Sequence, residues 1–307
     1  MGYNTYTTSD IVDNIKLVGH VPVGNSTFTT ANLIKLADRE LQLPIMKQIL
    51  STRGGYYLTY EDFEIASDGL YVIPTDAIAG ALANVELVQE PTIIPVNIIE
   101  ESEQFSTESP TSTSYGCFLK GNYVQILPIP NIGVARFWFY KRPSALIPTS
   151  QAAQVTAING AILTVSSVPS VIINGRDVDV LGDQPPFNVL GERTITDITG
   201  VNITLDEAVT GVAVGDWIAL HKQTPIPQIP VEYRPLLEQR VVSKIYELQG
   251  YLDKMGASNN VLKELEAATF SLITPRIKSQ SKVINPVNGG FLSGNPNRMS
   301  NFPAGRE

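Results

Sequence analysis

Residues 153–181 read AQVTAINGAILTVSSVPSVIINGRDVDVL, and residues 189–220 continue in the same style with VLGERTITDITGVNITLDEAVTGVAVGDWIAL. Both stretches consist of short Val, Ile and Thr runs separated by turn-forming pairs such as Asn-Gly, Thr-Gly and Gly-Asp. Runs of this length and composition are typical of β-strands joined by tight turns. They predict that residues 148–223 form an independent all-β insert, either a small barrel or a sandwich.

Helical spacing is found on both sides of this segment. A cap cluster at residues 26–30 leads into apolar positions that recur every three to four residues up to Ile49, and Pro44 is expected to kink or split this helix. After the insert, an apolar stripe predicts one helix over residues 233–252. A second helix is expected after Gly256, capped near Ser258 and ended by Pro275; its apolar stripe consists of Val261, Leu262, Leu265, Ala268 and Leu272.

The region between the first helix and the insert is predicted to be largely extended. Residues 56–58 and 70–73 are interpreted as two short strands that pair with each other, and residues 75–88 as a short helix followed by a strand. A polar loop at residues 107–114 precedes three further strands over residues 117–119, 123–127 and 134–140. The motif Phe137-Trp138-Phe139-Tyr140 fits a buried strand better than a base-stacking platform, because few basic residues accompany it.

The elements together predict an α+β fold: a helical bundle with associated β-strands, an inserted all-β barrel or sandwich domain, and an extended C-terminal tail. The expected divisions are residues 1–147 for the N-terminal part of the body and 148–223 for the insert. Residues 224–275 would be a helix pair that completes the body, and residues 276–307 the tail. No internal repeat of solenoid length is found.

Charge and cysteine content argue against several kinds of function and site. The net charge is −8, but the last 32 residues carry five basic side chains and one acid, so residues 1–275 carry −12. This acidic balance argues against a broad phosphate-binding surface. Cys117 is the only cysteine, which excludes an internal disulfide and a cysteine zinc site and indicates a reducing environment. No leader and no membrane-spanning segment is expected.

Groups that could perform catalysis are sparse. The two histidines, His20 and His221, are interpreted as exposed or locally bonded imidazoles, and no phosphate loop or hydrolase motif accompanies them. Asp177 and Asp179, two apart in a strand and close to Asp183, could form a carboxylate metal site, although a solvated strand face is the preferred interpretation. The sequence therefore predicts no enzyme, no catalytic residues, no cofactor and no metal.

Two segments together resemble a known family. These are TYTTSDIVDNIKLVGHVPVGNSTFTTANLIKLADRELQLPIMKQILSTRGGYYL near the N-terminus and IPQIPVEYRPLLEQRVVSKIYELQGYLDKMGASNNVLKELEAATFSLITPR near the C-terminus. In element order and helix style the chain resembles head-to-tail adaptor (neck or connector ring) proteins of tailed bacteriophages. The resemblance implies a structural virion protein made in the host cytoplasm and placed at the head–tail junction.

Further expectations come from the same resemblance. The partners would be the portal protein and tail or neck proteins, and the chain would form a homo-oligomeric ring with twelve-fold symmetry. DNA would pass through the bore without sequence-specific binding, which an acidic body favours because it repels phosphates. The main alternative is a tail-associated structural module that binds a receptor or a carbohydrate, and a further rival is a peptidoglycan hydrolase.

The basic tail is the predicted docking segment for the partner. Its charges oppose those of the body, and a few apolar residues could anchor in a groove of a partner once the tail orders on binding. The candidate docking residues are Arg276, Lys278, Lys282, Val283, Ile284, Phe291, Leu292 and Arg298.

A chain ending at Pro275 is expected to unfold with a free energy within about 1 kcal/mol of the full protein, because the tail has few contiguous apolar positions. It is expected to lose its attachment to portal or tail proteins. Urea denaturation and a pull-down with purified portal protein measure the two effects. A truncated chain that still joins portals, or that no longer folds, would contradict this role.

Overall fold

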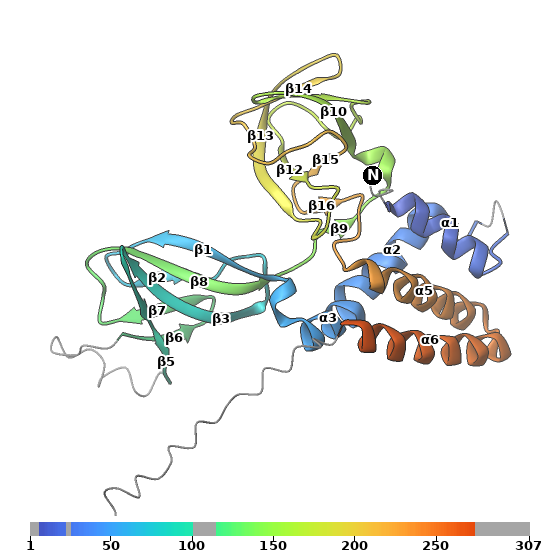
Figure 1. Cartoon of the computed structure of the whole chain (residues 1–307), viewed down its shortest axis with the longest axis horizontal. Helices are drawn as coiled ribbons and strands as arrows, with labels where there is room; N and C mark the ends of the chain where they lie inside the picture. The colour runs from blue at the N-terminus through green and yellow to red at the C-terminus, as the bar shows by residue number, and fades with distance from the viewer. Residues whose placement is uncertain (1–5, 23–25, 101–114, 274–307) are drawn as a thin grey trace, which may run out of the picture. The chain divides into compact units, whose positions relative to one another are not determined.

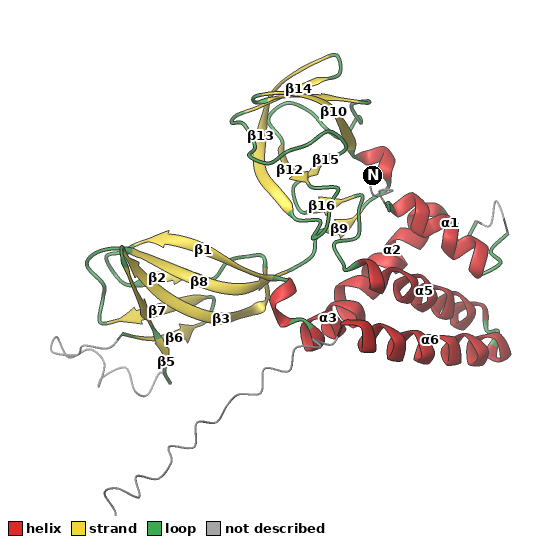
Figure 2. Ribbon diagram, in the orientation of Figure 1, coloured by secondary structure: helices red, strands yellow, loops and turns green. Residues whose placement is uncertain are grey.

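The computed structural model describes residues 6–22, 26–100 and 115–273, and the described elements are mainly β-strands. They form a closed barrel, two four-stranded sheets and a two-stranded parallel pair (Figures 1 and 2). The predicted fold class, a helical bundle with associated strands and an inserted domain, is therefore wrong. The strands do not accompany a helical core, because the sheets build hydrophobic cores of their own.

The helical part has one core of its own. Helices α1 (Thr8–Val18), α2 (Thr30–Glu40) and α3 (Met46–Thr52) pack with α5 (Arg234–Gln249) and α6 (Leu252–Ile273) around fully buried residues such as Leu33, Ile49 and Leu237. Thr29 caps α2 by accepting the backbone N–H of Asn32, as the cap cluster predicted. Pro44 lies in a π-helical turn, Leu41–Ile45, between α2 and α3, because proline offers no N–H for the regular ladder.

Two parts of the helical prediction need correction. Helix α1 was not predicted, although Thr7 and Asp10 form a capping box and its buried residues follow helical spacing. Helix α6 begins at Leu252 instead of after Gly256. Ser258 is buried within α6, and its hydroxyl oxygen accepts a hydrogen bond from Gln239 Nε2 at 2.7 Å, so it joins α6 to α5 and caps nothing.

Two four-stranded sheets share one core. The first has the order β1 (Leu58–Glu64), β8 (Val134–Lys141), β3 (Ala77–Gln89), β4 (Thr92–Pro95); the second has β2 (Leu70–Val72), β7 (Tyr123–Leu127), β6 (Gly116–Lys120), β5 (Asn97–Ile98). Both contribute to the core, for example through Phe137 on β8 and Ile126 on β7. The strands predicted over residues 117–119, 123–127 and 134–140 are confirmed. The strand β8, predicted to be buried, buries only alternate residues, among them Phe137 and Phe139.

The predicted pairing of residues 56–58 with residues 70–73 is wrong. Strand β1 pairs with β8 and β2 pairs with β7, so the two segments predicted to pair belong to different sheets. Strand β3 replaces the predicted short helix. The Ala-rich start of β3 pairs antiparallel with β8, and the pairing is interrupted by register shifts around Ala79 and Gly80, which have positive φ. Pairing with a central strand thus outweighs the helix preference of alanine.

The barrel contains a duplication that the sequence analysis missed. Its strands are β10 (Ala153–Asn159), β11 (Ile162–Val165), β12 (Asp177–Leu181), β13 (Val189–Thr199), β14 (Asn202–Leu205) and β15 (Trp217–Leu220), closed in the order β10-β11-β14-β13-β12-β15. Residues 153–181 align without gaps on residues 193–221, so each position has an equivalent position forty residues later. Matched residues include Thr156 and Thr196, Ile158 and Ile198, Gly160 and Gly200, Thr164 and Thr204, and Gly175 and Gly215.

The backbone pairing obeys the same forty-residue shift. Exchanging the two halves leaves the strand order unchanged, and β12 pairs with β15 in a register that maps onto itself. Both first strands carry a register shift at matching places, Val155/Ala157 and Ile195/Asp197. The Thr156 hydroxyl donates to the carbonyl of Thr164, and its counterpart Thr196 donates to the carbonyl of Thr204, each at 3.1 Å. The barrel therefore has internal two-fold pseudosymmetry.

Replacing Ile245 with Ala is expected to lower the free energy of unfolding by about 2–5 kcal/mol, because Ile245 is fully buried in the helical core. Leu248 on the same helix is 65% exposed. The matched variant Leu248→Ala should change the free energy by less than about 0.5 kcal/mol. Urea denaturation followed at helix-sensitive wavelengths compares the two, and equal effects would contradict the packing of α5.

Candidate functional site

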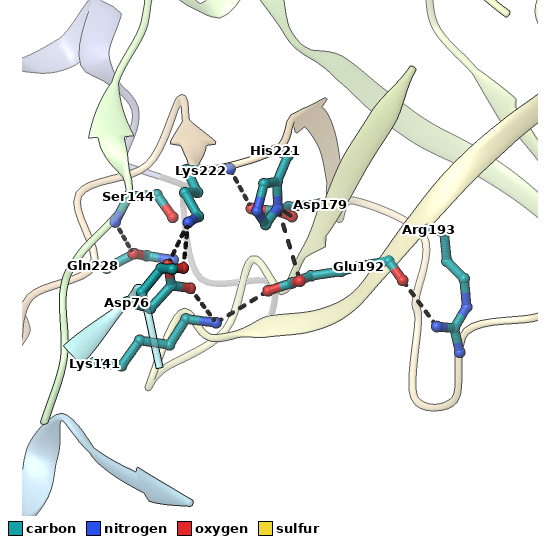
Figure 3. Close-up of polar contacts among 10 residues, drawn as sticks. Asp76, Lys141, Ser144, Asp179, Glu192, Arg193, His221, Lys222 and Gln228 are labelled. Atoms are coloured by element: carbon teal, nitrogen blue, oxygen red, sulfur yellow. Dashed lines mark hydrogen bonds and ion pairs between the residues drawn. The ribbon is translucent and has the colours of Figure 1, made fainter. Parts of the chain in front are cut away.

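A cluster of charged side chains lies beside the barrel strands β12 and β13 and the segment that follows β15. Asp179 comes from β12, Glu192 from β13, and His221 from the segment after β15 (Figure 3). His221 Nδ1 lies 2.8 Å from Asp179 Oδ1 and 3.9 Å from Glu192 Oε2. One carboxylate oxygen of each acid and one ring nitrogen of His221 lie within 4.8 Å of one another. This is a set of donors that could hold a metal ion.

Asp179 is the buried member of the cluster, with an exposed fraction of 1%. Its Oδ2 accepts the backbone N–H of Lys222 at 2.8 Å, and its Oδ1 faces the imidazole. Burial raises the pKa of Asp179, while the hydrogen bonds from His221 and Lys222 oppose the rise. Lys222 has a φ of 62°, a left-handed conformation uncommon outside glycine, and this places its N–H against the carboxylate.

Two lysines connect the cluster to the strands that precede the barrel. Lys222 Nζ lies 2.6 Å from Asp76 Oδ1, and Lys141 Nζ lies 3.3 Å from Glu192 Oε1 and 3.7 Å from Asp76 Oδ2 (Figure 3). Burial works against ionisation of Asp76, but the hydrogen bond from Lys222 and the charges of both lysines outweigh it and lower the pKa of this carboxyl. Asp76 is therefore held ionised between two cations.

Sequence reasoning found part of this cluster. Asp179 and His221 were candidates, but the solvated strand face is the wrong interpretation for Asp179, which is buried. Asp177 is exposed and accepts the Thr194 hydroxyl at 2.8 Å, and Asp183 is not among the grouped donors. Glu192 was missed, since a single Glu in a strand carries no motif. His20 is exposed and is not part of the cluster.

The chemistry available at the cluster is ion binding or ion pairing. No Ser, Thr or Cys nucleophile contacts His221 among the hydrogen bonds of the described residues, and the imidazole is bonded to a carboxylate. The eight residues predicted to dock a partner, from Arg276 to Arg298, lie outside the described part of the chain. The structure therefore does not test that prediction.

A second feature of the described residues concerns α6. Of the apolar stripe that the sequence shows, Leu262 and Leu265 pack against the helical core. Val261 and Leu272 are instead 45% and 62% exposed, and Ala268 is exposed as well. These three, with Ala257, follow one line along the helix at intervals of four, seven and four residues. We call this line the α6 outer stripe. It borders the packed face of α6.

Comparisons with known proteins add no assignment: no family model matches the chain, and no match to a curated protein is found. None of the helices in the described ranges is long and apolar enough to cross a membrane.

Replacing Asp76 with Asn is expected to lower the free energy of unfolding by about 1 kcal/mol at pH 7, after discounting for solvent screening. The folded-state pKa of Asp76 is lowered, so its contribution is present above the unfolded pKa of about 4 and is lost as pH falls through the folded pKa. The difference between wild type and variant should therefore shrink below about pH 4. Urea denaturation across this range measures it.

The matched control is Glu207→Gln. Glu207 is 76% exposed and lies 3.6 Å from Arg193, so this surface pair should contribute little at any pH. A variant at Asp76 that matches wild type at pH 7, or a difference that grows on acidification, would contradict the role assigned to Asp76.

Proposed function

We propose that the chain is a structural subunit of a ring at the head–tail junction of a tailed bacteriophage, an adaptor between portal and tail, and that it is not an enzyme. The observation that carries the proposal is the α6 outer stripe. The apolar residues of α6 include both a part that packs against the helical core, Leu262 and Leu265, and an exposed part, the α6 outer stripe, on whose line the exposed Glu264 also lies. The exposed part fits contact with another protein surface.

A second copy of the chain is the proposed occupant of this stripe. Ring subunits contact each other head to tail, so one face of each subunit must remain uncovered until the ring closes. Val261, Ala268 and Leu272 are small or medium apolar residues on one straight line, which suits close packing of a neighbouring element.

Charge supports the same proposal. Residues 1–275 carry −12, and repeating such a subunit around a ring gives a strongly negative assembly. Phosphates would be repelled from its bore, so that DNA slides through without being held. The ring would join the portal protein on one side and tail proteins on the other. Its twelve-fold symmetry rests on the family resemblance alone.

One pair of aromatic residues bears on the alternative function, the binding of a receptor or a carbohydrate. Tyr60 on β1 is 48% exposed, and its ring centroid lies 4.9 Å from that of Trp138 on β8. The two rings are inclined by 55°, and the Trp138 N–H donates to Glu86 at 2.9 Å. A sugar platform needs a flat face and free polar groups, and this pair offers neither. The adaptor proposal is therefore preferred.

Replacing Val261 with Glu is expected to abolish ring formation and to leave the subunit folded, because the new charge lies on the α6 outer stripe. The matched control is Asn260→Glu. It adds the same charge at the adjacent exposed position, about 100° around the helix. Native mass spectrometry of each protein with purified portal protein measures the assembly, and urea denaturation checks the fold.

Rings that form equally with both variants would remove the α6 outer stripe from the interface. A wild-type protein that stays a closed dimer in the presence of portals would contradict the adaptor function itself.

A further inference from the structure

The duplication of the barrel supplies an internal comparison for the charged cluster. Shifted by forty positions, Asp179 corresponds to Ala219, His221 to Leu181 and Glu192 to Ala152. These three apolar counterparts also lie together. Ala152, Leu181 and Ala219 are buried in one small hydrophobic cluster with Ile147. Asp179 and Ala219 are cross-strand partners in the pair β12–β15, so the two sets lie next to each other, at equivalent positions filled with different chemistry.

The apolar set shows that this backbone needs no charge at these positions. Two of the three counterparts are alanines and one is leucine, and the strands β10–β15 and β12–β13 pair in equivalent registers. Burying a carboxylate such as Asp179 costs free energy, and well-packed apolar residues commonly stabilise as well as a buried ion pair does. The charged set is therefore not explained by the fold of the barrel. It calls for a separate role.

The donor geometry is close to what a transition metal requires. Tetrahedral zinc holds nitrogen and oxygen ligands at about 2.0–2.2 Å, which places those ligand atoms roughly 3.3–3.6 Å from each other. The distances from His221 Nδ1 are 2.8 Å to Asp179 Oδ1 and 3.9 Å to Glu192 Oε2, one shorter and one longer than that range. Movements of under about 1 Å of the partly exposed His221 and Glu192 side chains around the buried Asp179 would satisfy it.

The surroundings provide both support and access. The backbone N–H of Lys222 fixes the second oxygen of Asp179, as an outer-shell partner does at a metal site. The side chains of His221 and Glu192 are 34% and 49% exposed. Both line an open depression of about 240 Å³, which gives an ion a path to the donors. Lys141 competes for Glu192 but has Asp76 as a second partner.

We propose that Asp179, Glu192 and His221 form a site for a divalent transition metal, with zinc as the best match to two carboxylates and an imidazole. His221 Nδ1 coordinates the ion, together with a carboxylate oxygen from each of Asp179 and Glu192. Water completes the coordination. The ion joins β12, β13 and the segment after β15, and this role does not depend on the proposed adaptor function.

Isothermal titration of the full-length, chelator-treated protein with zinc chloride tests the site. Wild type is expected to bind one ion per chain, to melt at a higher temperature with zinc, and to respond little to magnesium, which prefers all-oxygen sites. Cobalt(II) should give a visible absorption band at the same stoichiometry. His20→Ala is the control for the other histidine and should bind as wild type does.

The decisive variant copies the apolar counterparts: Asp179→Ala, Glu192→Ala and His221→Leu together. It should fold, because the counterpart positions already carry these residues, and it should lose zinc binding. Glu192→Ala alone, at the most exposed ligand, should weaken binding at least tenfold. Lys141→Met removes the competing cation without removing a ligand and is expected to tighten binding.

Three results would overturn the proposal. They are a wild-type protein that takes up no zinc at micromolar concentration, a Glu192→Ala variant that binds zinc as wild type does, and loss of binding in His20→Ala. If the cluster were only an ion-pair network, Lys141→Met and Glu192→Ala would destabilise the protein alike and zinc would shift neither melting temperature.

Discussion

Closure of the barrel is the constraint on which the rest of the structure depends. Six strands from two similar halves must each find a partner on both sides, and the observed order lets every strand do so while the halves exchange places. The two halves of the barrel therefore have equivalent backbones, related across the pair β12–β15. Chemistry at a position in one half can be compared with chemistry at its counterpart in the other, with the fold held constant.

Strong local signals made part of the fold predictable. Val, Ile and Thr runs with tight turns predicted strands between residues 153 and 220, and helical spacing predicted α2, α5 and the break at Pro44. The fold class failed because the remaining strands are defined by their partners. Strand β3 begins with alanines that favour a helix in isolation, and it is extended because β8 lies beside it. Strand pairing between distant segments leaves no periodic trace in either one.

The candidate site was predictable only in pieces. Asp179 attracted attention as one of two acids in a strand, and His221 as one of two histidines. Nothing local distinguishes Glu192, which joins them through the register of β12 and β13. The forty-residue repeat is the signal that could have found all three, because aligning the halves places each charged residue opposite Ala or Leu. The repeat is hard to recognise because only five of its 29 aligned positions are identical and six more exchange Val, Ile and Leu.

The charged cluster and the α6 outer stripe act on different parts of the molecule, but Lys141 connects the cluster to a larger network. Its ammonium lies between Glu192 of the barrel and Asp76 of the segment before β3. A cation held by Glu192 would repel Lys141 and leave Asp76 as its favoured partner. Asp76 already contacts both Lys141 from β8 and Lys222 from the segment after β15. Because Lys141 and Asp76 both lie outside the barrel, the ion pair between Lys222 and Asp76 would then be the one in this network that still joins the barrel to the strands before it.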